Sequence, residues 1–271
     1  MSGQIKIVKS RPVGSGGREL VYWRMDNGNI HTGLCEWTTM PKETLREYVR
    51  DIKERIPTGE IRTKEVHTLE IFDGFCDEAT RTGLVYRCNR RPKDLREILL
   101  KSEKFKHTLR RSFSRDIATQ IRSLHVHFQL PHNALRTESF VFFFDDRKHR
   151  TPCNEIWVLD WARPPSLDIY QHPEYQADKP AWFYQAWSLM MVLSEIATWE
   201  PLDGTVQDKT ELLRMRTERK QLLTSSDWED PQDTKVFQFG FGVLEKDRET
   251  LEKYSHWQVK RFYDRLCDLL A

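Results

Sequence analysis

The chain has 271 residues, a length that suits one large domain or two lobes that share a cleft. Hydrophobic residues make up 38% of it, enough for a buried core, and no apolar run approaches the roughly 18 residues of a membrane span. The 43 basic and 41 acidic side chains leave a net charge of +2, which gives no general reason to expect nucleic acid or a membrane as a partner.

The first half of the chain predicts a small sheet with one helix. Asp26-Asn27-Gly28 is a strong hairpin turn between two strands, because Asn and Gly tolerate positive φ. Pro41–Arg55 predicts a helix, with Pro in its first turn and Leu45 and Val49 on one side. The expected strands cover residues 4–8, 20–25, 30–37, 66–75 and 83–88.

After Asn89-Arg90-Arg91-Pro92 the pattern becomes helical. Residues 181–199 are apolar on most sides, as expected of a buried central helix. A hairpin of residues 140–144 and 155–159 interrupts the helices. The other expected helices cover residues 93–100, 108–127, 210–223 and 248–270. The alternating stretch Phe237–Gly242 is unusual among helices, and the sequence offers no account of it.

Five cysteines are scattered through the chain without a Cys-x-x-Cys pair, at positions 35, 76, 88, 153 and 267. This distribution is typical of reduced thiols. The polar start Met1–Gln4 does not resemble a signal peptide. We therefore expect a cytoplasmic or nuclear, intracellular protein.

A polar loop between the helix of 108–127 and the hairpin is the most informative stretch. It reads His132-Asn133-Ala134-Leu135-Arg136-Thr137-Glu138-Ser139. Loops held between rigid elements commonly carry function. This loop resembles the catalytic loop of protein kinases, H-R-D-L-K-P-E-N: His132, Leu135 and Glu138 match it, and Arg136 stands in for the lysine.

Three further segments resemble motifs of the same family and follow in the family's order. They are Asp160-Trp161-Ala162 for D-F-G, His172-Pro173-Glu174 for A-P-E and Gln185–Met190 for D-x-W-S-L-G. The segments around Asp160 and Trp187 also resemble kinase-like domains of filamentous fungi. The resemblance is convincing over residues 108–200 and only architectural elsewhere.

The resemblance implies an α+β, two-lobed protein-kinase-like fold. Residues 1–87 form the β-rich lobe, 88–92 the hinge and 93–271 the mostly helical lobe. In the family, Glu174 pairs with an arginine of the helical lobe, for which Arg261 and Arg265 are candidates. The prolines Pro164 and Pro165 predict a stiff connector before it, because proline fixes φ and removes a donor.

The groups that phosphoryl transfer needs are replaced in this loop. Ala134 stands at the place of the catalytic Asp, and a methyl group cannot orient or deprotonate a hydroxyl. Ser139 stands at the place of the Asn that holds magnesium, and it is a poorer ligand. No lysine lies between Lys9 and Lys42, so the third strand offers none to the phosphates.

Two features remain that would contact nucleotide or metal. Asp160 is the one metal ligand in place; the favoured interpretation is a strand-end Asp bonded to local backbone, and the alternative is residual contact with magnesium or ATP. Gly14 and Gly16 form a G-x-G without the third glycine, where Glu19 stands instead. A flexible turn is favoured over a phosphate-binding loop.

The leading hypothesis is a pseudokinase, a catalytically inactive kinase-like module that binds other proteins as a signalling scaffold or regulator. The alternative is an active phosphotransferase with rearranged groups, in which Asp145, Asp146 or Asp160 replaces the base and Lys42 reaches the phosphates of ATP. A third hypothesis is a partner-binding domain unrelated to kinases.

Two other patterns are expected to be structural. The histidines 125, 127 and 132 lack accompanying acids or cysteines at metal-ligand spacing. The basic clusters Arg87–Arg96 and Lys101–Arg115 contain acidic residues and lack interleaved aromatic side chains, so solvated helix faces are favoured over nucleic-acid contacts.

Overall fold

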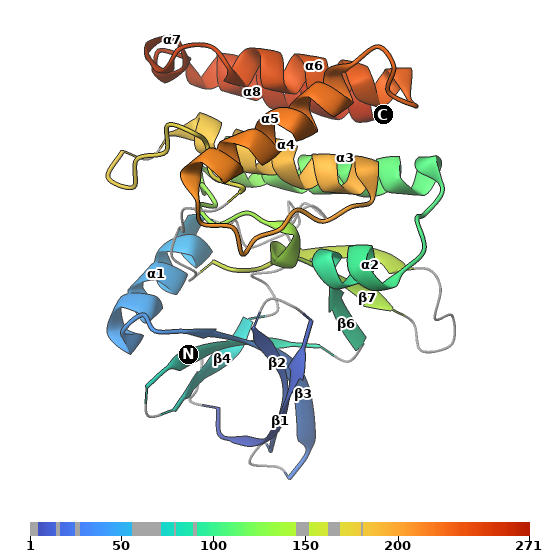
Figure 1. The fold of residues 1–271 in the computed structure, drawn as a ribbon. Coiled ribbons are helices and arrows are strands. Elements are labelled where there is room, and N and C mark those ends of the chain that lie inside the picture. The colour runs from blue at the N-terminus through green and yellow to red at the C-terminus, as the bar shows by residue number, and fades with distance from the viewer. Residues whose placement is uncertain are drawn as a thin grey trace. The chain divides into compact units, whose positions relative to one another are not determined.

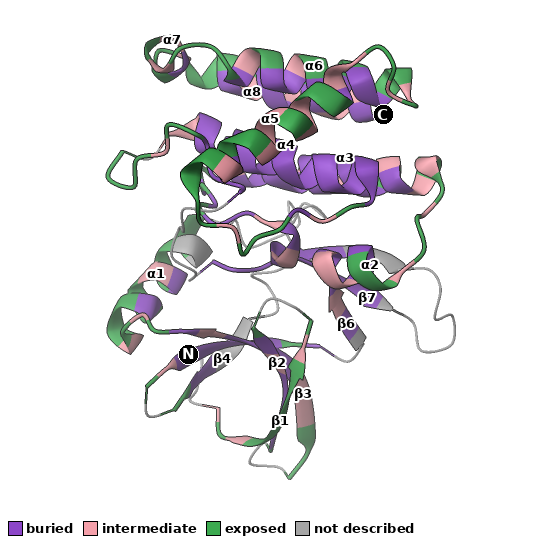
Figure 2. Cartoon of the chain, viewed as in Figure 1, coloured by how far each residue is buried: buried purple, intermediate pink, exposed green. Residues whose placement is uncertain are grey.

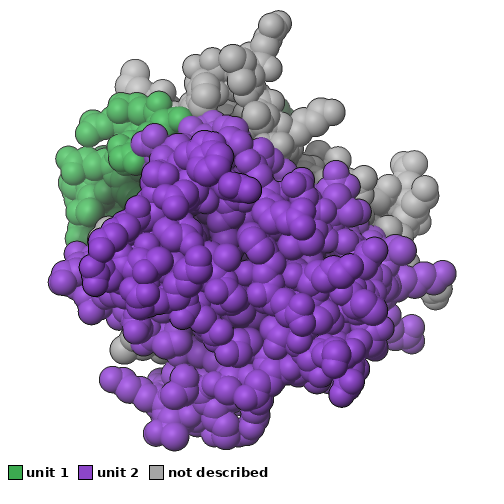
Figure 3. All heavy atoms as spheres, turned by 90° about the horizontal axis from the view of Figure 1, so that it is seen from above, with its two compact units in different colours: residues 1–98, 138–163 green, residues 99–137, 164–271 purple. Residues whose placement is uncertain are grey.

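The computed structural model describes residues 5–14, 17–24, 28–55, 72–78, 80–88, 91–144, 152–161, 169–179 and 181–271. The chain is an α+β protein whose N-terminal part holds a five-stranded antiparallel sheet and whose C-terminal part is mostly helical (Figure 1). It divides into two compact units (Figure 3). Unit 1 comprises residues 1–98 and 138–163, and unit 2 comprises residues 99–137 and 164–271. This division by contacts falls after Ile98, whereas the sequence placed a connector at 88–92.

The larger sheet of unit 1 has the strand order β1-β2-β3-β5-β4, with every pair antiparallel. The predicted hairpin is confirmed, because β2 and β3 pair from Glu19↔Cys35 to Arg24↔Ile30. Gly28 has a φ of 83°, the conformation for which the turn needs glycine. The strands are β1 (Ile7–Val13), β2 (Arg18–Arg24), β3 (Ile30–Thr38), β4 (Phe72–Asp77) and β5 (Thr82–Arg87).

Both faces of this sheet are covered, since alternate residues of a strand point to opposite sides. On one face α1 (Lys42–Arg55) buries Leu45 and Val49 against apolar residues of the strands. On the other face Trp23 packs in a smaller cluster with Val21 and Val85. The helix predicted at 41–55 is therefore confirmed, together with the side of it that was expected to face the core (Figure 2).

A second sheet of unit 1 contains the predicted hairpin and one strand that the sequence did not indicate. β7 (Phe140–Phe144) lies between β6 (Arg91–Asp94) and β8 (Pro152–Val158). The segment of β6 lacks strand-forming residues, and its pairing with β7 holds it extended. The helix predicted at 93–100 consequently begins later, as α2 (Leu95–Lys101), with Asp94 Oδ1 accepting the Glu97 N–H at 2.7 Å.

Unit 2 is built around α4, where every residue from Phe183 to Thr198 is buried (Figure 2). α4 packs against α3 and α6, and α8 packs against α3 and α6 as well (Figure 1). These helices confirm the expectations for residues 108–127, 181–199 and 210–223, the first of which ends in a π-helical turn over Ser123–His127. The helices are α3 (His107–Arg122), α4 (Trp182–Thr198), α5 (Lys209–Thr224), α6 (Pro231–Leu244), α7 (Arg248–Glu252) and α8 (His256–Leu270).

The stretch Phe237–Gly242 belongs to α6, which the alternation of Phe with other residues had hidden. Phe237 and Phe241 are one helical turn apart and stack with ring centroids 6.1 Å apart. Gly240 lies directly against the side chain of Met190, so that any Cβ there would meet it. The glycine therefore permits close packing of α6 on α4.

The single helix expected over 248–270 is wrong, because the chain breaks between α7 and α8. Ser255 begins α8 with a capping box: its side chain accepts the Gln258 N–H, and the Gln258 side chain accepts the Ser255 N–H at 2.8 Å. Among the helices that the described residues form, none is long and apolar enough to cross a membrane. Four described cysteines are free thiols, at positions 35, 76, 88 and 267.

Candidate functional site

The clearest polar site of unit 1 surrounds Asp160, which follows β8. Asp160 has a φ of 68° and is only 3% exposed. Its Oδ1 accepts a hydrogen bond from Arg18 Nη2 at 2.6 Å, and its Oδ2 accepts one from Ser139 Oγ at 2.8 Å. Its backbone N–H donates to Glu36 Oε2 at 3.0 Å. The aspartate is therefore bound to residues remote in sequence, and not only to local backbone.

Arg18 is the cation of this site. It is the first residue of β2, and it is 3% exposed. Besides the ion pair with Asp160, its Nη1 donates to the carbonyl oxygen of Glu138 at 2.6 Å. The side chain of Glu138 is also engaged, because its carboxylate lies 3.6 Å from Arg96 Nε. The hydrogen bonds of Arg18 thus tie β2 to the segments on both sides of the β7–β8 hairpin.

The surrounding charges determine the ionisation of Arg18. Burial by itself would lower the pKa of Arg18, but the neighbouring carboxylates raise it above its ordinary value. These carboxylates belong to Asp160, Glu36 and Asp94. Burial also raises the pKa of Tyr86 well above its ordinary value, and the charge of Glu36 adds to this shift. We call Arg18, Glu36, Asp94, Ser139 and Asp160 the Asp160 cluster.

The glycine turn before β2 lies against one of these carboxylates. Gly14 has a φ of 67°, and any Cβ at this position would collide with Oδ2 of Asp94. Asp94 is itself fixed, because its Oδ1 accepts the N–H of Glu97 at the start of α2. The space that a phosphate would need beside Gly14 is therefore filled by a carboxylate. Gly16, the second predicted glycine, lies outside the described residues.

The loop predicted as the centre of the site divides between the two units. In unit 2, His132 is buried, and its Nδ1 accepts the Ala134 N–H at 3.3 Å. Arg136 Nε donates to the Ala134 carbonyl oxygen at 3.5 Å, and Asn133 is exposed. In unit 1, Ser139 is fully buried, and its carbonyl oxygen accepts the Leu159 N–H at 2.8 Å. Among the predicted residues, the structure brings Ser139 and Asp160 into direct contact.

Sequence reasoning missed Arg18, Glu36 and Asp94. The resemblance to kinases predicts a lysine on the third strand, whereas the cation present is an arginine at the start of the second. Glu36 had a readable signal, since it is a charged residue within the apolar strand β3 and is only 4% exposed. Lys42, the alternative cation, forms an ion pair with Asp77 of β4. Asp145 and Asp146 lie outside the described residues.

In unit 2 the segment before α4 contains a buried histidine. His172 lies among the rings of Phe183, Tyr184 and Trp187, with centroid distances of 5.2, 5.7 and 5.1 Å. Its Nδ1 accepts the Glu174 N–H at 3.1 Å. Burial lowers the pKa of His172 to about 4, so the ring is neutral at physiological pH.

The expected ion pair of Glu174 is wrong. Glu174 is exposed, and in the described part of the chain no ion pair joins it to Arg261 or Arg265. Its carbonyl oxygen instead accepts a hydrogen bond from the Tyr184 hydroxyl at 3.0 Å. The described residues of this segment are held by hydrogen bonds of their backbone to His172 and to the Tyr184 hydroxyl.

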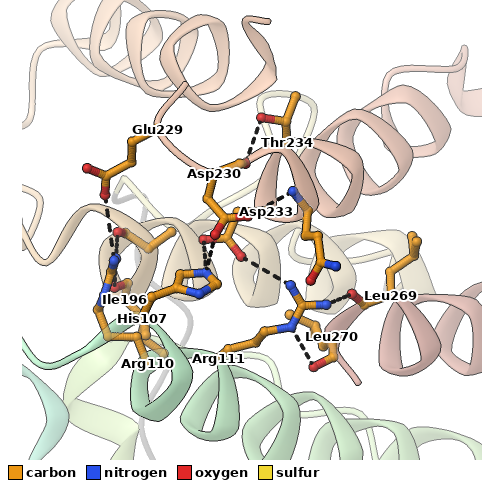
Figure 4. A network of polar contacts seen from close by, with 12 residues as sticks. His107, Arg110, Arg111, Ile196, Glu229, Asp230, Asp233, Thr234, Leu269 and Leu270 are labelled. Atoms are coloured by element: carbon orange, nitrogen blue, oxygen red, sulfur yellow. Dashed lines mark hydrogen bonds and ion pairs between the residues drawn. The ribbon is translucent and has the colours of Figure 1, made fainter. Parts of the chain in front are cut away.

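A second polar group of unit 2 joins the start of α3 to the start of α6 (Figure 4). His107 Nε2 lies 2.8 Å from Asp230 Oδ2 and 3.2 Å from Asp233 Oδ2. Partial burial would raise the pKa of Asp230, but N–H groups at the start of α6 lower it. Burial raises the pKa of Asp233. The donor atoms lie within 4.8 Å of one another, a spacing that a metal ion would accept.

The surroundings of this group favour a structural role. Arg111 places its Nη1 4.0 Å from Asp233, and its Nε and Nη2 donate to the carbonyl oxygens of Leu270 and Leu269 at the end of α8 (Figure 4). Asp230 Oδ1 accepts the N–H groups at the start of α6, where the helix dipole is positive. A guanidinium group and two helix N-termini oppose a bound cation. We interpret the group as a network that satisfies helix ends.

In comparisons with known proteins, the chain matches no family model, and no curated protein is significantly similar to it.

Proposed function

We propose that the chain is a protein-kinase-like domain without phosphotransfer activity, a pseudokinase that acts as a signalling scaffold or regulatory interaction module. Two kinds of observation support the proposal. Four sequence motifs resemble those of the family in the family's order. The element order, a five-stranded antiparallel sheet with one helix followed by mostly helical residues, is the order that this resemblance predicts.

The observation that carries the proposal is the state of Asp160. In a kinase this aspartate holds magnesium through its carboxylate. Here Arg18 and Ser139 each engage one of its carboxylate oxygens. A metal ion would have to displace a buried ion pair, and removal of one partner of such a pair costs about 3–5 kcal/mol. The bond to Arg18 therefore competes directly with the metal.

The charges of the Asp160 cluster oppose a nucleotide as well. The Arg18 guanidinium is surrounded by three carboxylates. The phosphates of ATP would approach these acids and a cation that is already paired. Beside Gly14 the Asp94 carboxylate takes the place of an anionic ligand. Ala134 supplies no base in the loop, and loss of a general base typically slows a reaction by about 10²–10⁴-fold.

Two measurements on the full chain test the proposal. Thermal melting with and without millimolar ATP and magnesium should show no shift, whereas a ligand present at 100 times its Kd stabilises by about 2.7 kcal/mol. Phosphotransfer from γ-labelled ATP to general substrates and to the chain itself should not exceed the background without protein.

Matched variants make the outcome decisive. Phosphotransfer that Asp160→Asn abolishes, and that the exposed-site control Asp178→Asn retains, would overturn the proposal and establish the active phosphotransferase instead. A melting shift without phosphotransfer would restrict the proposal to a nucleotide-binding pseudokinase and refute the competition between Arg18 and the metal.

A further inference from the structure

The end of unit 2 carries an open pocket of about 430 Å³ between α6 and α8. Its walls are aromatic and basic. The lining includes the side chains of Phe239, Tyr254, Trp257, Arg261, Phe262 and Arg265. A volume of this size falls in the range of binding pockets, roughly 300–1,000 Å³.

The aromatic side chains of the pocket are preorganised. Phe239 of α6 and Phe262 of α8 stack with ring centroids 5.5 Å apart. The Tyr254 hydroxyl lies 2.9 Å from Lys246 Nζ, and its ring stacks on Trp182. Trp257 is 62% exposed, although such a large apolar side chain is normally buried. An apolar group entering the pocket would cover it.

The two arginines at the pocket differ from other cations that contact α8. Lys260 Nζ lies 2.6 Å from Asp264, and Arg122 Nε of α3 lies 2.7 Å from the same carboxylate. Within the described residues, Arg261 and Arg265 have no carboxylate at ion-pair distance. The Arg261 guanidinium lies over the Trp257 ring, 5.3 Å from its centroid. Two cations with no acidic counterpart thus border an aromatic pocket.

This combination defines the chemistry of a ligand. Guanidinium groups bind carboxylates with paired hydrogen bonds, and Trp and Arg dominate the binding energy of protein interfaces. We propose that the pocket docks an acidic peptide segment, which inserts one large apolar side chain between Phe239, Trp257 and Phe262 and places carboxylates on Arg261 and Arg265. A nucleic acid fits less well, because a polyanion requires a longer basic stripe.

The proposal rests on the interaction role proposed above, for which it names a partner chemistry. Its test involves no nucleotide, so the two proposals fail separately. The probe is a set of four peptides labelled with fluorescein at the N-terminus, fluorescein-Ser-Glu-Asp-X-Glu-Asp-Ser-amide, in which X is Leu, Met, Phe or Trp. Each has a matched peptide with Gln and Asn in place of the acids. Binding is measured by fluorescence anisotropy as the full chain is added to a concentration of about 500 µM. At this concentration a Kd near 1 mM is still detected.

At least one acidic peptide should bind, and the matched peptide with Gln and Asn in place of the acids should bind at least tenfold more weakly. The double variant Arg261→Gln/Arg265→Gln should weaken binding by about 5- to 10-fold, and Trp257→Ala by about tenfold or more. Because these three side chains are exposed, thermal melting of the variants should stay unchanged. Arg115→Gln, at an exposed position of α3, is the matched control and should bind as the unaltered chain does.

Three outcomes would overturn the proposal. The first is that no acidic peptide binds. The second is that a Gln/Asn peptide or a labelled oligothymidine binds as tightly as the best acidic peptide, and that the Arg261→Gln/Arg265→Gln chain no longer binds it. The third is that the chain forms a dimer that Trp257→Ala dissociates, which would make a second copy the occupant of the pocket.

Discussion

Replacement of Arg18 by methionine should destabilise unit 1 more than any surface substitution. Methionine keeps the unbranched stem of the side chain but lacks the guanidinium group, so it removes the hydrogen bonds to Asp160 and Glu138, both 2.6 Å long. A hydrogen bond to a charged group contributes about 1.5–3 kcal/mol, so the two predict a loss of about 3–6 kcal/mol. The cost of breaking a buried ion pair, about 3–5 kcal/mol, agrees with this range.

The assay is urea unfolding at pH 7.5, followed by tryptophan fluorescence and far-ultraviolet circular dichroism. Arg50→Met, at an exposed position of α1, is the matched control and should change stability by less than about 0.5 kcal/mol. The double variant Arg18→Met/Asp160→Asn removes both charges. Its loss of unfolding free energy should be at least about 2 kcal/mol smaller than the sum of the losses of the two single variants.

The pH dependence provides an independent check. In Arg18→Met the Asp160 carboxylate is buried without its cation, which raises its folded-state pKa above the unfolded value of about 3.9. The folded variant then takes up a proton as the pH falls. The difference in free energy of unfolding between the variant and the unaltered chain should therefore become smaller between pH 7.5 and 5. The proposed role of the Asp160 cluster would be refuted if Arg18→Met lost less than about 1 kcal/mol of unfolding free energy and if the losses of the two single variants added up to that of the double variant.

Three further changes test other features. Burial lowers the pKa of His172 to about 4, so as the pH falls the unfolded chain takes up the proton before the folded chain does. Between pH 7.5 and 5 the free energy of unfolding of the unaltered chain, measured in urea, should therefore fall by about 2 kcal/mol relative to that of His172→Gln. An equal dependence of the two unfolding free energies on pH would contradict the burial of a neutral ring. Gly14→Ala should lower the free energy of unfolding by about 1–3 kcal/mol more than Gly17→Ala, because both glycines have positive φ but only Gly14 faces Asp94. Equal melting temperatures of the two variants would show that the contact with Asp94 is absent. Ser255→Ala should lower stability by about 1 kcal/mol through loss of the cap of α8, and Ser255→Asp should restore most of it.

Much of the architecture was predictable because local patterns determine it. The strands of the β2–β3 hairpin are rich in strand formers and meet at a turn that Gly28 completes. Helix α4 is apolar on nearly every side, and only burial on all faces accommodates such a helix. The start of α8 was readable too, since Ser255 and Gln258 form a capping-box pattern that the prediction of one long helix overlooked.

The remainder depends on partners distant in the chain. β6 is extended only because β7 pairs with it, and its own residues do not favour a strand. The phenylalanines of α6 alternate as in a strand although they lie in a helix, and the neighbouring Met190, 50 positions away, explains Gly240. The ion pair of Arg18 and Asp160 joins residues 142 positions apart, and no local pattern in one sequence indicates such a pair.

The discontinuity of unit 1 has a consequence for synthesis of the chain. The sheet of β1 to β5 leaves the ribosome first, and residues 99–137 of unit 2 follow before the β7–β8 hairpin appears. At about 5–20 residues per second this interval lasts seconds. Throughout it the apolar cluster beneath α1 lacks Val141, Phe143, Trp157 and Leu159, and Arg18 lacks the carboxylate of Asp160.

The nascent sheet therefore presents an apolar face, and an Arg18 that lacks its Asp160 partner, until the hairpin arrives. Such a face is the kind of surface that chaperones bind and that aggregates. A chain that stops before residue 140 should accumulate as insoluble protein, whereas one that extends past Asp160 completes the cluster. The order in which the ribosome delivers these segments makes the β7–β8 hairpin the last part required for a folded N-terminal unit.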